Sequence, residues 1–107
     1  MSINNSNVVD YIGINLKGDV VLTIADELEW DEKNEHLLLL QDKLNKYLAF
    51  IESGEIYEQY PRALNRSIVI EIVAKYNPSK DGEKFVEMVK DRLTSAGYNL
   101  YFRVFSE

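Results

Sequence analysis

Hydrophobic residues alternate with polar ones along several short segments of this sequence, and in two longer segments they recur every three or four positions. Near the N-terminus, residues 8–16 and 20–25 are rich in Val, Ile and Tyr and flank a turn that contains Gly18. Glycine supplies the positive φ that tight hairpin turns require, and β-branched residues favour strands. The pattern therefore predicts a β-hairpin. Residues 1–7 are polar and rich in Asn, so we expect a frayed start and order from Val8 onward.

The longest periodic segment, residues 35–52, predicts an α-helix. Its main apolar residues fall at steps of three and four and form one stripe. They are Leu37, Leu40, Leu44, Leu48 and Ile51. Further hydrophobic residues widen the stripe, which predicts a largely buried helix lying across a sheet. Asp31 or Asn34 is the expected N-terminal cap, and Gly54 ends or bends the helix. For residues 55–65 we expect an extra turn and a loop.

In the second half of the chain, a segment in which hydrophobic and polar residues alternate is again followed by a segment with helical spacing of hydrophobic residues. Residues 67–76 predict a strand whose aliphatic side chains face the core, with Glu71 and Lys75 directed toward solvent. A turn cluster of Asn, Pro, Ser and Gly then precedes residues 83–95, which predict the second helix. Residues 98–105 alternate again and predict the last strand.

The predicted order of elements is therefore ββαβαβ. Strand–helix–strand units with short connections place their strands parallel, so we expect the second, third and fourth strands to run in one direction and the first to run against the second. This predicts an α+β fold, a two-layer sandwich in which a four-stranded mixed sheet carries two helices on one face. The other face is left to water or to a partner. A single domain should span residues 1–107.

Charge and composition narrow the classes of partner. The formal net charge of −6 argues against nucleic acid, because phosphate contacts depend on clustered Lys and Arg, whereas a protein with a basic surface is allowed. The basic pair Arg62 and Arg66 could dock on an acidic patch of the same chain or of a second copy. No apolar run approaches the roughly 20 residues of a membrane helix, so no membrane is expected. The lack of Cys and of a signal-like start favours a cytoplasmic protein.

His36, the only histidine, lies beside Glu32 and Glu35, and this arrangement could serve general-base chemistry. A single His in the first turn of a helix, in a chain without Cys, is more typical of an ordinary surface or half-buried residue. The acidic residues within 26–35 offer oxygen ligands for Ca²⁺ or Mg²⁺, but apolar residues interrupt them and no EF-hand pattern is present. Negative charge also favours the start of a helix. We therefore predict no catalytic, cofactor-binding or metal-binding residue.

Five aromatic or acidic residues are the predicted partner-binding residues. Trp30, the only tryptophan, either covers one end of the core or anchors a partner, and Asp31 and Glu32 follow it directly. In the last strand, Tyr101 and Phe105 add apolar groups to a second face of the sheet, as an oligomer contact would.

Several stretches of the sequence resemble a family of small uncharacterised bacterial proteins. They are residues 9–14 (VDYIGI), 28–31 (LEWD), 35–41 (EHLLLLQ) and 43–55 (KLNKYLAFIESGE). The shared residues are mainly of core and capping types. The resemblance implies a bacterial cytoplasmic protein with no established activity, and it associates the chain with immunity-like proteins.

Three functional hypotheses remain open. The first is a non-enzymatic protein-interaction domain, immunity-like in one form, that presents the acidic loop or the open sheet face to another protein. The second is a homodimeric structural or regulatory domain, joined through the last strand or the exposed sheet face. The third is a small-ligand-binding protein or an enzyme that uses His36 and nearby carboxylates.

Overall fold

The structure, a computed structural model, describes residues 11–105 of the chain. The frayed start expected for residues 1–7 and the beginning of the first strand at Val8 lie outside this part. The elements follow one another as β1 (Tyr11–Ile14), β2 (Val20–Asp26), α1 (Glu35–Glu52), α2 (Glu55–Gln59), the 3₁₀ turn η1 (Pro61–Ala63), β3 (Ile68–Ala74), α3 (Lys80–Ser95) and β4 (Asn99–Val104). The predicted order of strands and long helices is confirmed, and α2 with η1 is the extra turn.

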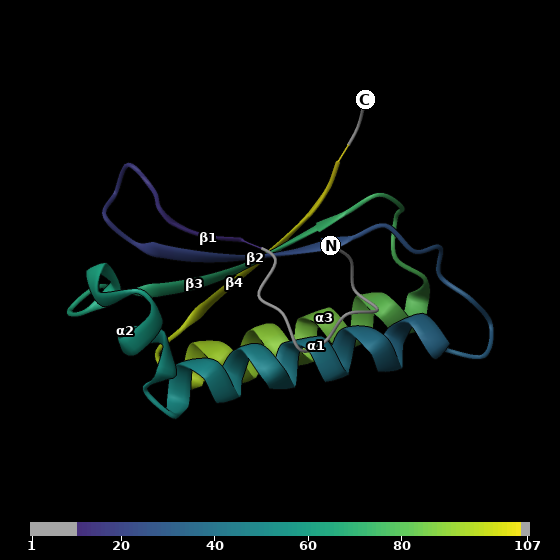
Figure 1. Cartoon of the computed structure of the whole chain (residues 1–107). Coiled ribbons are helices and arrows are strands. Elements are labelled where there is room, and N and C mark those ends of the chain that lie inside the picture. Colours follow the sequence, from purple (N-terminus) through teal and green to yellow (C-terminus); the bar gives the residue numbers. More distant parts are fainter. Residues whose placement is uncertain (1–10, 106–107) are drawn as a thin grey trace.

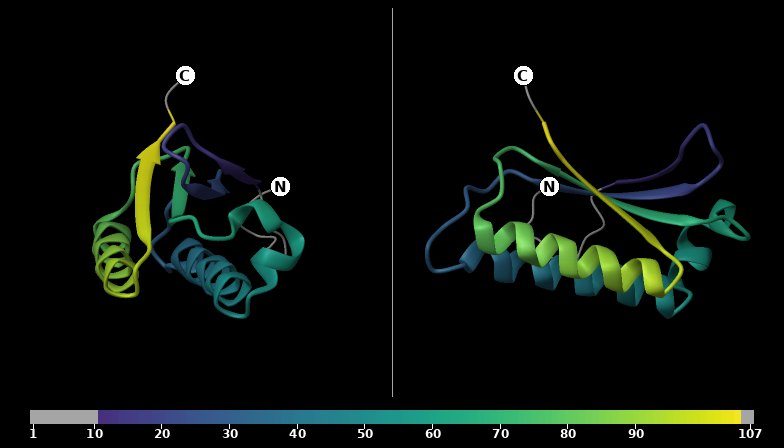
Figure 2. Two further views of the ribbon diagram at one scale, coloured as in Figure 1. Left: turned by 90° about the vertical axis from the view of Figure 1, so that its left-hand side faces the viewer. Right: turned by 180° about the vertical axis from the view of Figure 1, so that it is seen from behind.

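The four strands form one sheet in the order β1-β2-β3-β4. β1 runs antiparallel to β2, with Ile12 opposite Leu22, whereas β2, β3 and β4 run parallel. These are the predicted directions. α1 and α3 lie side by side against one face of the sheet, and no helix of the described chain covers the other face (Figure 1, Figure 2). The predicted α+β sandwich is therefore confirmed.

The core lies between this sheet and the two long helices. Its strand residues are Val20, Leu22, Ile24, Ile68, Ile70, Ile72 and Leu100. Its helix residues include Leu40, Leu44, Tyr47 and Ile51 of α1 and Phe85 and Leu93 of α3. Burial of one such large side chain contributes about 1.5–3 kcal/mol. This layer fixes the carboxyl end of β2 relative to the start of α1.

The buried face of α1 differs from the predicted leucine stripe. Leu37 and Leu48 are only half-buried, whereas His36 and Lys43 are buried. The Nζ of Lys43 lies 5.7 Å from the centre of the Tyr47 ring. The Tyr47 hydroxyl donates a hydrogen bond of 2.7 Å to a backbone carbonyl of β2. Polar contacts therefore help to set the orientation of the helix, and a stripe drawn from hydrophobic residues alone does not include them.

α3 begins three residues before its predicted start. The Oγ of Ser79 accepts a hydrogen bond of 3.1 Å from the N–H of Gly82 and so caps the first turn. Gly82, which the sequence pattern assigned to a turn, is helical and buried. Just past the other end of the helix, Gly97 has a φ of +93°, a conformation common for glycine at this position.

The loop between β1 and β2 is held by polar contacts. Gly18 has a φ of +89°, as the predicted turn requires, and Asn15 Oδ1 accepts hydrogen bonds of 3.0 and 2.9 Å from two N–H groups of the loop. The Nη1 of Arg66 donates to the Gly18 carbonyl at 3.0 Å, and its Nε donates to the Arg62 carbonyl at 2.8 Å. Among the described residues, the hydrogen bonds of Arg66 therefore go to backbone carbonyls of two loops and not to an acidic patch.

Candidate functional site

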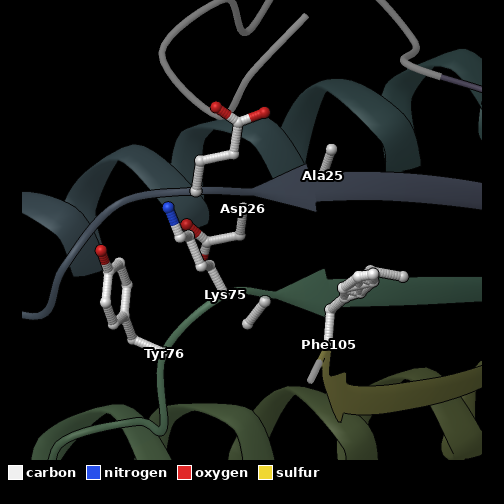
Figure 3. Close-up of a pocket in the computed structure, with 8 residues that line it drawn as sticks. Ala25, Asp26, Lys75, Tyr76 and Phe105 are labelled. Carbon is white, nitrogen blue, oxygen red and sulfur yellow. The ribbon is translucent and has the colours of Figure 1, made fainter. Parts of the chain in front are cut away.

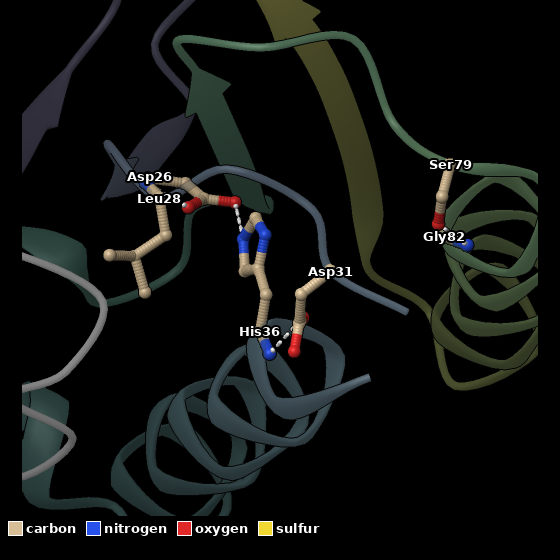
Figure 4. A network of polar contacts seen from close by, with 6 residues as sticks. All are labelled: Asp26, Leu28, Asp31, His36, Ser79 and Gly82. Carbon is tan, nitrogen blue, oxygen red and sulfur yellow. Dashed lines mark hydrogen bonds and ion pairs between the residues drawn. The ribbon is translucent and has the colours of Figure 1, made fainter. Parts of the chain in front are cut away.

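A buried pair of ionisable side chains, Asp26 and His36, lies where β2 ends and α1 begins. Alternate residues of β2 face the helices, so the carboxylate of Asp26, the last residue of the strand, points into the core. The first turn of α1 places the His36 imidazole opposite it, with Nε2 2.6 Å from Asp26 Oδ2 (Figure 4). The side chains of His36 and Asp26 are 2% and 0% exposed. The expectation of a surface or half-buried His36 was therefore wrong.

Burial and hydrogen bonding act in opposite directions on Asp26. Removal from water raises the pKa of its carboxyl above the ordinary value, while the hydrogen bond and charge of His36 and the N–H of Leu28 partly offset this rise. The Leu28 N–H donates to Asp26 Oδ1 at 3.2 Å. Burial therefore favours the protonated form of Asp26, and these donors act in favour of the carboxylate.

Asp31 caps α1 and fixes the backbone next to the pair. Its Oδ1 accepts from the His36 N–H at 3.0 Å, and its Oδ2 accepts from the Glu35 N–H at 3.1 Å. These N–H groups, that of His36 most of all, hold the pKa of the Asp31 carboxyl below its usual value. Asn34, the other candidate cap, has a φ of 58° and makes no side-chain cap. Asp31 is therefore the capping residue.

Trp30 packs over the same pair. Its ring lies 3.9 Å from the His36 ring, centre to centre, at a tilt of 36°. It also contacts α3 so closely that a Cβ on Gly82 would lie 2.6 Å from a ring carbon. Trp30 is half-buried and packs against the core, as the covering role predicted. Its role as an anchor for a partner stays a prediction.

The indole nitrogen of Trp30 and the second imidazole nitrogen of His36 are enclosed. Trp30 Nε1 and His36 Nδ1 are both buried, and neither has a hydrogen-bond partner in the structure of residues 11–105. The other imidazole nitrogen of His36 is engaged with Asp26. His36 therefore does not present a nitrogen to a substrate in solution, as a general base must.

Carboxylates gather where the β2–α1 loop meets the start of α3. We call this surface the acidic end; its carboxylate residues, all exposed or half-buried, are Glu29, Asp31, Glu32, Glu35 and Asp81. The same segments contain two lysines, Lys33 and Lys80. A hydrogen bond of 3.1 Å from Asn34 Nδ2 to Asp81 Oδ2 ties the loop to the helix. The acidic end is thus built from two distant parts of the chain.

A hollow of about 310 Å³ lies between these two segments. Its lining residues are Trp30, Asp31, Glu32, Asn34, Ser79, Lys80 and Asp81. Three of the five predicted partner-binding residues, Trp30, Asp31 and Glu32, are therefore brought together here.

The other two predicted residues, Tyr101 and Phe105, lie on the sheet face that no described helix covers. Tyr101 lines a hollow of about 400 Å³ together with Tyr11 and Val69. Phe105 borders a hollow of about 570 Å³ at the carboxyl ends of β2 and β3, with Lys75 between it and Tyr76 (Figure 3). The predicted residues thus fall on two separate surfaces.

Neither surface contains a recognisable metal centre. Among residues 11–105 no group of three or more His, Cys, Asp or Glu side chains is arranged to hold a metal ion. None of the helices in that part of the chain combines the length and the apolar character that crossing a membrane requires.

A family model for a family of unknown function, DUF6572, matches residues 1–106. The chain belongs to the DUF6572 family. The expected resemblance to an uncharacterised family is confirmed. No curated protein and no solved structure matches this DUF6572 chain.

Sequence reasoning missed the Asp26–His36 pair of the DUF6572 chain, although two signals for it were present. Asp26 continues the inward-facing alternation of Val20, Leu22 and Ile24. His36 lies four positions before Leu40, on the same face of the helix. The contact of Trp30 with Gly82 had no comparable signal, because 52 positions separate the two residues and no periodic pattern connects them.

Proposed function

We propose that this chain is a non-enzymatic protein-interaction domain that binds a partner with a basic surface through its acidic end. One observation carries the proposal. Exposed carboxylates from the β2–α1 loop and from the first turn of α3 meet at one end of the molecule, joined by the hydrogen bond between Asn34 and Asp81. Gathered charge of one sign steers association with an oppositely charged partner and favours it over neutral or acidic proteins.

The internal contacts of the loop support this role. The Asp31 cap and the packing of Trp30 against His36 and Gly82 hold the loop in one arrangement. A surface ordered before binding loses less conformational entropy when the partner arrives. The carboxylates of Glu29 and Glu32 are exposed and can contact a partner directly.

The buried pair favours a structural role over an enzymatic one. Catalysis by His36 would need an imidazole nitrogen within reach of a substrate. One nitrogen is bonded to Asp26 and the other is enclosed beside Trp30. We therefore assign the pair to positioning the start of α1 beneath the end of β2.

An immunity-like role is one specific form of the proposal. An immunity protein of bacterial cytoplasm that neutralises a basic toxin would need an exposed acidic surface of this kind. The arrangement of genes tests this form, since a toxin gene directly upstream is expected for it. An isolated gene would remove the reason to prefer a toxin over other basic partners.

Charge reversal on the acidic end tests the proposal. The double variant E29K/E32K is used as bait in lysate of the source cells. We expect it to retain at least tenfold less of any basic protein that the wild-type chain retains. The matched control is E52K/D91K, which makes the same change of charge at exposed positions of α1 and α3 outside the acidic end. Equal retention by both variants, or retention only of acidic proteins, would refute the proposal.

A further inference from the structure

We propose that the face of the sheet without helices is the surface through which two copies of this chain associate. We call it the open face. Its larger apolar and aromatic side chains are Tyr11, Val21, Val69, Val73, Tyr101 and Phe105. They come from all four strands and from the residue that follows β4, and they point away from α1 and α3, because the alternate residues of these strands fill the core.

Exposed aromatic side chains concentrate on this face. Tyr11, Tyr101 and Phe105 are 63%, 54% and 49% exposed, although a monomeric domain gains nothing from leaving three large rings in water on one side. The aliphatic layer beneath them is better covered, since Val69 is only 3% exposed. Aromatic residues are frequent anchors of protein interfaces.

The open face carries both projections and hollows, which is what a twofold interface needs. In such an interface the same patch meets itself, so every protruding group must find its recess on an identical surface. The hollow beside Tyr11 and Tyr101 measures about 400 Å³. The one beside Phe105 measures about 570 Å³. Each can receive an aromatic ring from the second copy.

Charge identifies a second copy as the occupant. Within residues 11–105, four charged side chains border the open face, Glu27, Glu71, Lys75 and Arg103, and their formal charges cancel. Asp26 also lines the hollow beside Phe105, but its buried side chain points into the core toward His36. Arg103 already pairs with Glu71, with Nε 3.4 Å from Oε2. The net charge of −6 is therefore carried by the rest of the chain. Two acidic molecules can approach through this neutral face with little repulsion, whereas a basic partner gains little from it.

The size of the face indicates a weak, reversible dimer. Four strands spaced about 4.8 Å apart, with up to about seven residues rising 3.3 Å each, cover roughly 400 Å² of flat area. Stable interfaces bury about 800 Å² on each partner. Side-chain relief increases the buried area, but this interface still lies at the small end of the range. Interfaces at this end of the range are typical of weak, transient association, so we expect dimers only at high protein concentration.

Sedimentation equilibrium between about 10 and 500 μM tests the proposal. We expect wild type to form dimers and Y101E, which brings a charge from each copy into the interface, to weaken association at least tenfold. The matched control is L38E, because Leu38 is an equally exposed apolar residue, 60% exposed, on α1. Its dimer should be unaffected. Circular dichroism checks that both variants are folded.

A second measurement does not depend on a variant. In a dilution series followed by amide NMR, the concentration-dependent shifts should cluster on the four strands. A monomeric mass at 500 μM, equal weakening by L38E, or shifts confined to the helices would each overturn the proposal. Shifts confined to the outer edge of β4 would also overturn it, because they would indicate edge-to-edge pairing of strands.

Discussion

At the scale of single residues, the buried carboxyl group of Asp26 relies on one side-chain partner. It is a carboxylate with no exposed side-chain surface, and His36 is the only side chain bonded to it within residues 11–105. A buried charge that loses its partner costs far more than an exposed one. The pair is therefore where a single substitution should affect stability most strongly.

We expect His36→Ala to lower the free energy of unfolding by about 3 kcal/mol near pH 7.5, because it leaves the Asp26 charge buried without its partner. Without the hydrogen bond and charge of His36, the pKa of Asp26 should rise further above its ordinary value. A group whose pKa is raised in the folded state stabilises the protein below its unfolded pKa and loses this contribution as the pH rises through the folded pKa. Urea unfolding at several pH values measures the effect.

The double variant D26N/H36A tests whether the charge of the buried Asp26 causes the loss of stability in H36A. It lacks the buried carboxylate, so it should be more stable than H36A at pH 7.5, and the difference should shrink as the pH falls toward the ordinary carboxyl pKa of 3.8. A difference that stays constant from pH 7.5 down to that value would contradict the raised pKa.

The hydrophobic pattern of the sequence predicted the strand and the helix that carry this pair, but the burial of the pair itself was not predicted. The alternation of β2 and the spacing of α1 were both visible in the sequence, and together they direct Asp26 and His36 into the core. Polar residue type argued against burial, since ionisable side chains are mostly exposed. Pattern and residue type thus disagreed, and the structure follows the pattern.

At the scale of elements, boundaries were predictable where periodicity was uninterrupted. α1 spans Glu35–Glu52 as predicted, because its apolar residues recur without a break. The start of α3 was predicted too late, because glycine normally marks a turn and Gly82 lies in the first turn of this helix. Its presence there has a tertiary cause, the close approach of the Trp30 ring. A contact between distant segments leaves no local signal.

This close approach makes Gly82→Ala destabilising. In an ordinary helix the change stabilises by up to about 1 kcal/mol. Here the new methyl group would lie 2.6 Å from a carbon of the Trp30 ring, which also packs on His36 and has little room to move. We expect a loss of about 1–3 kcal/mol, measured by urea unfolding, and a shift in the fluorescence of this single tryptophan.

The matched background for that test is Trp30→Leu, which removes the ring. In W30L the further change G82A should be neutral or stabilising, because only the gain in helix propensity remains. A stabilising effect of G82A in the wild-type background would show that the loop does not pack on α3 in this way.

At the scale of the whole molecule, the two surfaces differ in charge and in the segments that form them. The acidic end is built from the β2–α1 loop and the start of α3, whereas the open face is built from the strands and is electrically balanced. The sequence predicted members of both groups, Trp30, Asp31 and Glu32 in one and Tyr101 and Phe105 in the other. It did not predict that the start of α3 contributes to the acidic end, because this depends on the path of the loop toward a distant segment.

The two surfaces should respond differently to salt. Binding of a basic partner to the acidic end should weaken as sodium chloride rises from 0.05 to 0.5 M, because screening removes its main attraction. Association through the open face should strengthen or stay constant, because the same screening reduces the repulsion between two copies that each carry a charge of −6. Retention of the basic partner by the bait measures binding at the acidic end. Sedimentation equilibrium at both salt concentrations measures self-association through the open face.

Each variant should likewise affect only one of the two surfaces. E29K/E32K moves the net charge from −6 to −2, because each exchange adds two positive units, so its dimer should be as strong as that of wild type or stronger. Y101E should in turn keep the basic partner, because Tyr101 lies on the open face and not among the residues that line the hollow of the acidic end. If E29K/E32K abolished the dimer, the acidic end would belong to the self-association surface, and the assignment of two independent surfaces would be wrong.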